Sequence, residues 1–136
     1  MNIDSIQNGY VIDHIKAKNA INIYNALSLQ ELDCSVAIIT NVKSQKMGRK
    51  DIIKIDKKID LDMTMLGFLD KNATINIIEN GVNVSKTKIK IPDEIINLAK
   101  CQNPRCITKT ERGIDDIFYL KNGTYRCAYC ESALEN

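Results

Sequence analysis

Four cysteines in the last third of the chain limit how it can fold more than any other feature of the sequence: Cys101, Cys106, Cys127 and Cys130. They form two close pairs, Cys-x4-Cys and Cys-x2-Cys, with twenty residues between the pairs. Two such pairs on a short segment supply four sulfurs to one tetrahedral metal ion. Thiolates select zinc, and four of them leave no open position for chemistry, so the spacing predicts one structural zinc ion per chain. The alternatives are scattered core cysteines or a disulfide framework, and the latter belongs to oxidising compartments.

The segment that carries these cysteines is short. Residues 101–136 number thirty-six, and a chain below about 40 residues rarely folds on its apolar core alone. Zinc binding contributes roughly 10–16 kcal/mol to the folding of small modules, so this segment should unfold when the metal leaves. Ile107 and Thr108 follow the first pair, and Tyr125 and Arg126 precede the second, which predicts that each pair lies where a strand meets a turn.

Composition and charge narrow the class of protein. The 136 residues suffice for one domain or two small ones, and the net charge of +2 comes from interleaved signs, without a run of five like charges. This balance of charges argues against a protein whose main function is to bind nucleic acid. No run approaches the roughly 20 apolar residues of a membrane span, and the first residues lack the apolar stretch of a signal peptide, so we expect a reducing, cytoplasmic location. The fifth cysteine, Cys34, is expected to be a small buried or half-buried side chain.

Before the cysteines, the pattern alternates between strands and helices. β-Branched content and alternation predict strands, and apolar stripes predict helices. Three Asn-Gly pairs, which begin at Asn8, Asn80 and Asn122, are typical of hairpin turns because both central positions need positive φ. The expected elements are strands at residues 10–15, 35–42, 49–55, 74–79 and 82–90, and helices over residues 20–27 and 60–69.

This order predicts an α+β chain with a ferredoxin-like split β-α-β sandwich, an antiparallel sheet with two helices on one face. The sandwich would occupy residues 1–91. Pro92 followed by two acids predicts a short linker helix over residues 92–100. Residues 101–136 would form a small all-β, zinc-ribbon-like domain.

Alternation gathers polar side chains on one face of the expected sheet. Lys50 and Lys54 point away from the core side of the third strand, and Asn76 and Lys86 lie on the neighbouring strands. A face of this kind suits a polyphosphate and the hydrogen bonds of a base. The alternative is an ordinary solvated face, since lysines also protect exposed strands and edges.

The single histidine, His14, follows Asp13 directly. Neighbours on a regular strand point to opposite faces, so the two can share a pocket only if the pleat breaks near Ile15. A structural role for His14 is the alternative to a functional one. No nucleophile motif accompanies the pair, and Gly48-Arg49-Lys50 lacks the upstream glycine of a phosphate-binding loop, so we expect no enzyme activity.

Several segments, taken together, resemble the regulatory chain of aspartate carbamoyltransferase. The similarity runs nearly end to end and in the same order, with an Ile-Pro-x-x-Ile link before the first cysteine. The Met-Gly-Arg-Lys-Asp segment combined with this cysteine spacing is specific. The segments that carry the resemblance are Gly9-Tyr-Val-Ile-Asp-His-Ile15, Met47-Gly-Arg-Lys-Asp-Ile-Ile-Lys-Ile55, Ala73-Thr-Ile-Asn76 and Cys101-x-Asn-x-x-Cys106-Ile107.

The resemblance implies a non-catalytic allosteric subunit of pyrimidine biosynthesis. In this family the N-terminal domain forms a homodimer and binds nucleotides; CTP and UTP typically inhibit, and ATP typically activates. The zinc domain docks on the catalytic chain, and three regulatory dimers join two catalytic trimers. No membrane or nucleic-acid partner is expected.

The resemblance also implies the nucleotide site. The residue matching Lys86 meets phosphates, those matching Asp13 and Lys54 serve sugar and base, and Lys50 matches a residue near a second nucleotide. The carried-over set is Ile6, Val11, Asp13, His14, Lys50, Lys54, Asn76, Ile78 and Lys86. Two departures touch base recognition: Gly81 stands where better-known members carry a tyrosine, and the N-terminal arm is shorter, with Asp4-Ser5 in place of an acid and an alanine. Which nucleotide inhibits therefore stays open.

Two other functions compete with this one. A nucleic-acid-binding zinc ribbon is suggested by four aromatics in the zinc segment, Phe118, Tyr119, Tyr125 and Tyr129. Against it, the segment from Lys100 carries six basic and five acidic residues, and four thiolates with Zn²⁺ add a net −2. A free-standing metabolic sensor without a catalytic partner is the third possibility.

Overall fold

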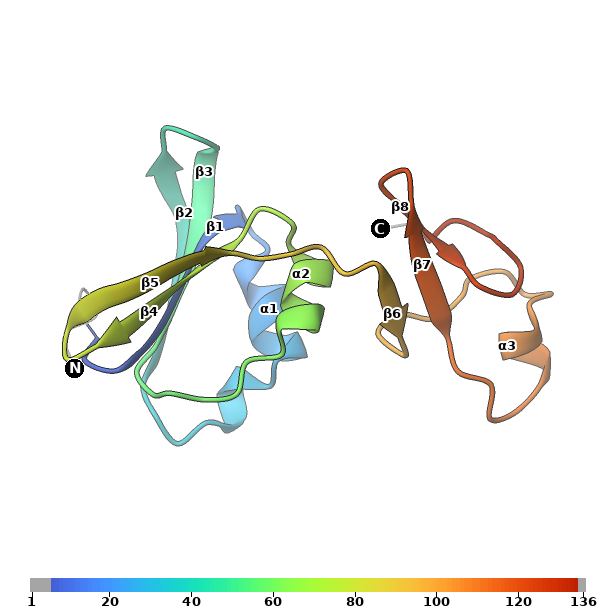
Figure 1. Ribbon diagram of the computed structural model, residues 1–136, viewed down its shortest axis with the longest axis horizontal. Helices are drawn as coiled ribbons and strands as arrows, with labels where there is room; N and C mark the ends of the chain where they lie inside the picture. The colour runs from blue at the N-terminus through green and yellow to red at the C-terminus, as the bar shows by residue number, and fades with distance from the viewer. Residues whose placement is uncertain (1–5, 135–136) are drawn as a thin grey trace. The chain divides into compact units, whose positions relative to one another are not determined.

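The chain divides into two compact units, Met1–Ile91 and Pro92–Asn136, and the computed structural model describes residues 6–134 of them (Figure 1). The first unit holds a five-stranded sheet and two α-helices, and the second a three-stranded sheet with one short helix. The longest helices in the described part have seven residues, and none is long and apolar enough to cross a membrane.

The sheet of the first unit is antiparallel throughout, in the order β2-β3-β1-β4-β5. Helices α1 and α2 lie on the same side of it (Figure 1). This is the split β-α-β arrangement with an added edge strand, so the α+β prediction is confirmed. The elements are β1 (Gly9–Lys16), α1 (Ala20–Ala26), a 3-10 turn (Leu29–Glu31), β2 (Val36–Ser44), β3 (Gly48–Ile55), α2 (Met63–Leu69), β4 (Thr74–Glu79) and β5 (Val82–Lys88).

The core lies between the helices and the sheet. Ile12, Ile53 and Ile75 from three neighbouring strands are buried against Ile23 of α1 and Leu66 of α2. Their spacing explains the elements, since strand residues alternate and helix residues recur every third or fourth position. Neither helix of the first unit covers the opposite face of the sheet (Figure 1).

A buried carboxylate organises the core at one end of the sheet. Asp51 on β3 is completely buried, and it accepts hydrogen bonds from the backbone N–H of Ala20, at 3.1 Å, and of Asn41, at 2.9 Å. The first bond satisfies an otherwise unpaired donor at the start of α1, and the second holds an irregularity of β2. The polar Asp51 side chain is therefore buried together with its hydrogen-bond partners.

Two of the three Asn-Gly pairs make hairpin turns. Asn80 and Gly81 have φ of 51° and 77°, and Asn122 and Gly123 have φ of 50° and 80°, as two-residue turns require. The prediction for Asn8-Gly9 is wrong, because Gly9 is the first residue of β1. A Cβ on Gly9 would lie 1.9 Å from the carbonyl oxygen of Ile55, so the glycine serves close strand approach.

The second unit consists of β6 (Glu94–Ile96), α3 (Ile107–Thr110), β7 (Ile117–Lys121) and β8 (Thr124–Cys127), with sheet order β6-β7-β8. The linker helix predicted for residues 92–100 is wrong. Residues 94–96 form β6 instead, because Ile95 pairs with Phe118 of β7 and both side chains are buried. Packing against a strand far along the chain overrides the local helix signal of Pro92 and its acids.

Candidate zinc site and nucleotide-binding face

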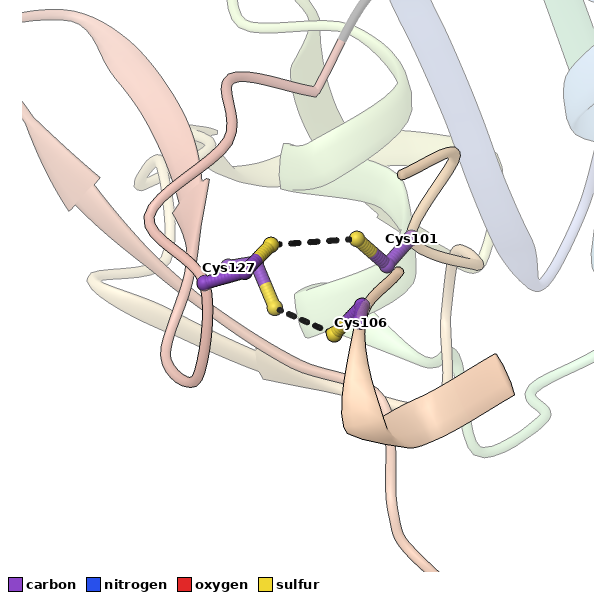
Figure 2. Close-up of side chains that lie close together, drawn as sticks. Cys101, Cys106 and Cys127 are labelled. Carbon is purple, nitrogen blue, oxygen red and sulfur yellow. Dashed lines mark hydrogen bonds between the residues drawn. The ribbon is translucent and has the colours of Figure 1, made fainter. Parts of the chain in front are cut away.

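The four cysteines converge at one point of the second unit. The Sγ atoms of all four lie within 4.8 Å of one another, and Cys101, Cys106 and Cys127 point their sulfurs toward a common centre (Figure 2). Cys127 ends β8, but Cys106 directly precedes the short helix α3, so the strand–turn prediction is wrong for the first pair.

The sulfur spacing fits a tetrahedral zinc ion. The Cys101 and Cys130 sulfurs lie 3.6 Å apart, and those of Cys106 and Cys127 lie 3.7 Å apart. Zn–S bonds of about 2.3 Å place neighbouring sulfurs of a tetrahedron about 3.8 Å apart, whereas a disulfide would need about 2.05 Å. All five cysteines are free thiols, and Cys34 stays outside the cluster. The cluster is thus a site for one structural zinc ion.

The environment gives the four thiols different affinities for protons. Burial raises the pKa of Cys101 to about 12 and also raises that of Cys127. Hydrogen bonds from Ser132 lower the pKa of Cys130 to about 6, and those from Thr108 lower that of Cys106. Zinc must therefore displace at least one proton when it binds near neutral pH.

In the first unit, predicted site residues from four strands fall into one row across the uncovered face. Val11 of β1 pairs with Lys54 of β3 on one side and with Asn76 of β4 on the other, and Asn76 pairs with Lys86 of β5. The row thus reads Lys54, Val11, Asn76, Lys86. Ile78, two positions from Asn76 on β4, lies on the same face. Ile6, which precedes β1, is buried.

Asp13 lies on this same face by regular alternation from Val11, and an irregularity of β1 brings His14 to it as well. The pairing of β1 with β3 shifts between Ile12 and Ile15, and His14 has a φ of 57°. The pleat is broken at the place that a shared pocket requires. The backbone N–H of His14 donates to Asp13 Oδ1 at 2.6 Å, and the His14 Nδ1 atom lies 3.0 Å from the Thr74 hydroxyl.

Charges shape the site around this bulge. Lys50 Nζ lies 3.0 Å from Asp13 Oδ1, and both side chains are largely buried. Burial raises the pKa of Asp13, but the hydrogen bonds from Lys50 and from the His14 N–H outweigh it and leave the pKa below its usual value. Burial lowers the pKa of His14; Asp13 opposes this shift, while Lys50, Lys86 and Lys46 add to it. Asp13 is therefore ionised and His14 neutral, and lysine ammonium groups lie near both.

The sequence analysis did not include two residues of this face in the candidate site. Thr74 of β4 is buried and contacts His14. Asn83 of β5 donates through Nδ2 to Asn76 Oδ1 at 3.0 Å. Counting residues outward from the Asn80-Gly81 turn pairs Asn83 with Ile78, as observed, so the register could have identified it.

Asn83 also fixes the direction of the Asn76 amide. The backbone N–H of Ser85 donates to Asn83 Oδ1 at 3.2 Å, so the Asn83 NH₂ group must face Asn76. At the other end, Asn76 Nδ2 lies 3.5 Å from the carbonyl oxygen of Val11. A backbone donor and a backbone acceptor thereby set the polarity of both amides.

Gly81, which stands where the family's tyrosine is expected, is hydrogen-bonded to the start of the described chain. The Gly81 N–H donates to the carbonyl oxygen of Gln7 at 2.9 Å, and the Asn80 N–H donates to Asn8 Oδ1 at 3.2 Å. A Cβ on Gly81 would meet the Gln7 side chain at 3.5 Å. The other half of this departure, Asp4-Ser5, lies outside the described residues.

Comparison with known proteins covers both units. The family described as "Aspartate carbamoyltransferase regulatory chain, allosteric domain" matches residues 1–90, and the one described as "Aspartate carbamoyltransferase regulatory chain, metal binding domain" matches residues 93–136. The chain is 48% identical over 134 residues to the regulatory chains of Clostridium botulinum (strain Hall) and Clostridium acetobutylicum, covering 96% of this chain and 92% of each relative. To that of Bifidobacterium longum it is 37% identical over 134 residues, covering 96% of both.

An allosteric domain followed by a four-cysteine metal domain defines a regulatory subunit, which acts through another chain and is not itself an enzyme. The chain belongs to the aspartate carbamoyltransferase regulatory chain family. Its partner is therefore the catalytic chain of that enzyme, which works in pyrimidine biosynthesis, and its metal is zinc.

Proposed function

We propose that the uncovered sheet face of the first unit binds nucleoside triphosphates as allosteric effectors. The observation that carries this proposal is the row of Lys54, Val11, Asn76 and Lys86 across four neighbouring strands. It offers two ammonium groups separated by an apolar and an amide side chain. Such a row suits a ligand with an anionic end and a flat, hydrogen-bonding end.

Each proposed contact follows from the charge and place of the side chain. Lys86 binds phosphate, Asp13 accepts from sugar hydroxyls, and Lys54 hydrogen-bonds the base or sugar. Lys50, which already pairs with Asp13, lies beside a second nucleotide. His14 lies close enough to Lys46, Lys50 and Lys86 for their charges to act on it, against that of Asp13, and these three ammonium groups are available to attract a polyphosphate. Ile6, Val11 and Ile78 complete the site as apolar neighbours.

The effectors are CTP and UTP as inhibitors and ATP as an activator. A nucleotide changes activity only by the difference in its affinity for two states of the holoenzyme. Gly81 stands where the family's tyrosine is expected and lies beside Gln7. Recognition of the base in this chain therefore depends on residues other than that tyrosine. Comparing all three nucleotides on one preparation measures the base preference.

The second unit docks on the catalytic chain. Ile107, which follows Cys106, and Tyr129, which precedes Cys130, are both more than 40% exposed at the two cysteine turns, at 44% and 46%. Exposed apolar and aromatic side chains on a metal-stiffened turn are typical of protein interfaces. Changing both to serine should weaken recovery of the holoenzyme while leaving zinc content unchanged.

The first unit pairs with a second copy of itself. Strands β2 and β5 are the two edges of the sheet, and each pairs with another strand of the described residues on one side alone. The dimer should persist after zinc is removed, because the metal lies in the other unit. Sedimentation of the full chain with and without a chelator measures this.

The location and the absence of a nucleic-acid partner follow from the cysteines and the charge. Free thiols in both units fit a reducing cytoplasm. The balanced charge of the zinc unit argues against binding of nucleic acid.

Calorimetry of CTP, UTP and ATP on the full chain tests the nucleotide site. Lys86→Ala should lower affinity roughly ten- to a hundredfold, because a charge-assisted contact is worth about 1.5–3 kcal/mol. Lys54→Ala should also lose discrimination between nucleotides. Lys57→Ala is the matched control, since this exposed lysine pairs with Asp33 outside the row. Unchanged affinity in Lys86→Ala would place the effector site elsewhere, and holoenzyme assembly should be normal in every variant.

A further inference from the structure

The four zinc-binding sulfurs share one local hydrogen-bonding pattern. Each cysteine has a backbone hydrogen bond to its sulfur from the residue two positions further along the chain. These donors are Asn103 for Cys101, Thr108 for Cys106, Tyr129 for Cys127 and Ser132 for Cys130. The backbone therefore gives each of the four sulfurs a donor at this position, and Cys127 accepts a further backbone hydrogen bond from Cys130.

In two of the four cases the donor residue adds a hydroxyl. Thr108 Oγ1 lies 3.2 Å from Cys106 Sγ, and Ser132 Oγ lies 3.3 Å from Cys130 Sγ. A zinc-bound thiolate carries no proton, so in the metal-loaded chain the hydroxyls must donate and the sulfurs accept. These are charge-assisted hydrogen bonds, which are stronger than those between neutral groups.

We propose that Thr108 and Ser132 are positioning residues of the zinc site, whose hydroxyls hold one thiolate from each cysteine pair. Their placement supports this role: each pair contributes one hydroxyl-bonded sulfur, on its second cysteine. Groups that hydrogen-bond to metal ligands orient them and spread their charge, and losing one typically weakens metal binding 10- to 100-fold.

The two sulfurs differ in how many side-chain donors they have. Cys130 is partly exposed, and the Asn103 side chain also hydrogen-bonds to its sulfur. The Arg105 N–H donates to Asn103 Oδ1 at 3.1 Å, which leaves the Asn103 NH₂ group to face the sulfur. Cys106 is buried, and Thr108 supplies its side-chain donor. Removing the Thr108 hydroxyl should therefore cost more than removing that of Ser132.

The test measures zinc affinity of the full chain by competition with a chromophoric chelator, and the sulfur-to-metal charge-transfer band of the cobalt(II)-substituted chain. Thr108→Val and Ser132→Ala should each weaken zinc binding about tenfold or more. The band should move to longer wavelength, because a thiolate without its donor releases electron density more easily. The position of this band depends on the electron density of the sulfurs. It therefore detects the loss of a hydrogen bond to a sulfur, independently of the zinc affinity.

Three control variants separate the hydroxyl from the side-chain shape. Thr108→Ser and Ser132→Thr keep the hydroxyl and should retain both affinity and band position. Thr110→Val removes a hydroxyl from the same short helix, where Oγ1 lies 3.5 Å from the carbonyl oxygen of Ile107, and should change neither. Wild-type affinity and band position in Thr108→Val and Ser132→Ala would overturn the proposal. So would an equal loss in Thr108→Ser and Thr108→Val, a comparison that holds even if the valine variant folds poorly.

Discussion

The Nδ1 atom of His14 lies 3.0 Å from the hydroxyl of Thr74, a residue sixty positions further along the chain. The contact exists because His14 has left-handed backbone geometry, with φ of 57°, at the bulge of β1. On a regular strand the ring would point into the core side, away from Asp13. The bulge instead places the His14 ring on the face of Asp13 and the proposed phosphate-binding lysines, so proton binding at His14 and nucleotide binding should be linked.

Nucleotide affinity should rise as the pH falls from about 8 to about 6. In the free chain, burial and the neighbouring lysines lower the pKa of His14. A bound triphosphate adds negative charge and raises that pKa, so binding takes up a proton and is favoured at lower pH. Calorimetry in buffers of different ionisation heats measures the uptake. His14→Asn, which tolerates positive φ, should remove this part of the pH dependence; a variant that takes up protons like the wild type would contradict the linkage.

Replacing Asn83 should weaken nucleotide binding although this residue is not a proposed charge contact. Asn83→Ala removes the donor to Asn76 Oδ1 and frees the Asn76 amide to rotate. A neutral hydrogen bond is worth about 1 kcal/mol, so triphosphate affinity should fall about fivefold. Thr87→Ala, on the same strand but paired with Ile75, is the control and should bind normally. Equal affinities in the two variants would show that the orientation of Asn76 is irrelevant.

Removing zinc should unfold the second unit and leave the first folded. Few apolar side chains of that unit are fully buried, Ile95 and Phe118 among them, so the metal supplies most of its folding free energy. Zinc binding should release protons and tighten as the pH rises, because burial raises the pKa of the Cys101 thiol to about 12 in the absence of metal. Hydrogen exchange with and without a chelator locates the unfolding. Cys127→Ser should abolish zinc binding and Cys34→Ser should not; retained protection in the metal-free second unit would refute this account.

Adding one methyl group at Gly9 should destabilise the first unit by about 3 kcal/mol. The new Cβ would lie 1.9 Å from the carbonyl oxygen of Ile55, so β1 and β3 must separate or shift. Gly48→Ala is the control, since its φ of 78° carries a backbone cost of about 1 kcal/mol but its Cβ meets nothing within 4 Å. Urea unfolding of the zinc-loaded chain gives both values. Equal destabilisation would contradict this prediction, because the close approach of Gly9 to Ile55 would then cost no more than the backbone strain at Gly48.

The sequence by itself determined the elements and the metal site. Local signals were sufficient for the strand β4, which begins and ends where alternation predicts, and for the apolar stripe of α1. The cysteine spacing identified all four sulfurs, because a tetrahedral ion imposes short gaps within each pair whatever the rest of the fold does. Where a local signal failed, as at Pro92, a distant partner strand had taken the segment.

Only the tertiary structure decided which way Lys86 and His14 face. Counting from the Asn80-Gly81 turn without irregularity would pair Lys86 with Ile75, on the core side. The shift of pairing at β4 and β5 between Ile77 and Ile78 pairs Lys86 with Asn76 instead. The bulge at His14 does the same for β1. One extra residue in a strand moves every later side chain to the opposite face of the sheet. The free-energy cost of such a bulge is offset only by packing and hydrogen bonds to distant strands, which no local sequence pattern reveals.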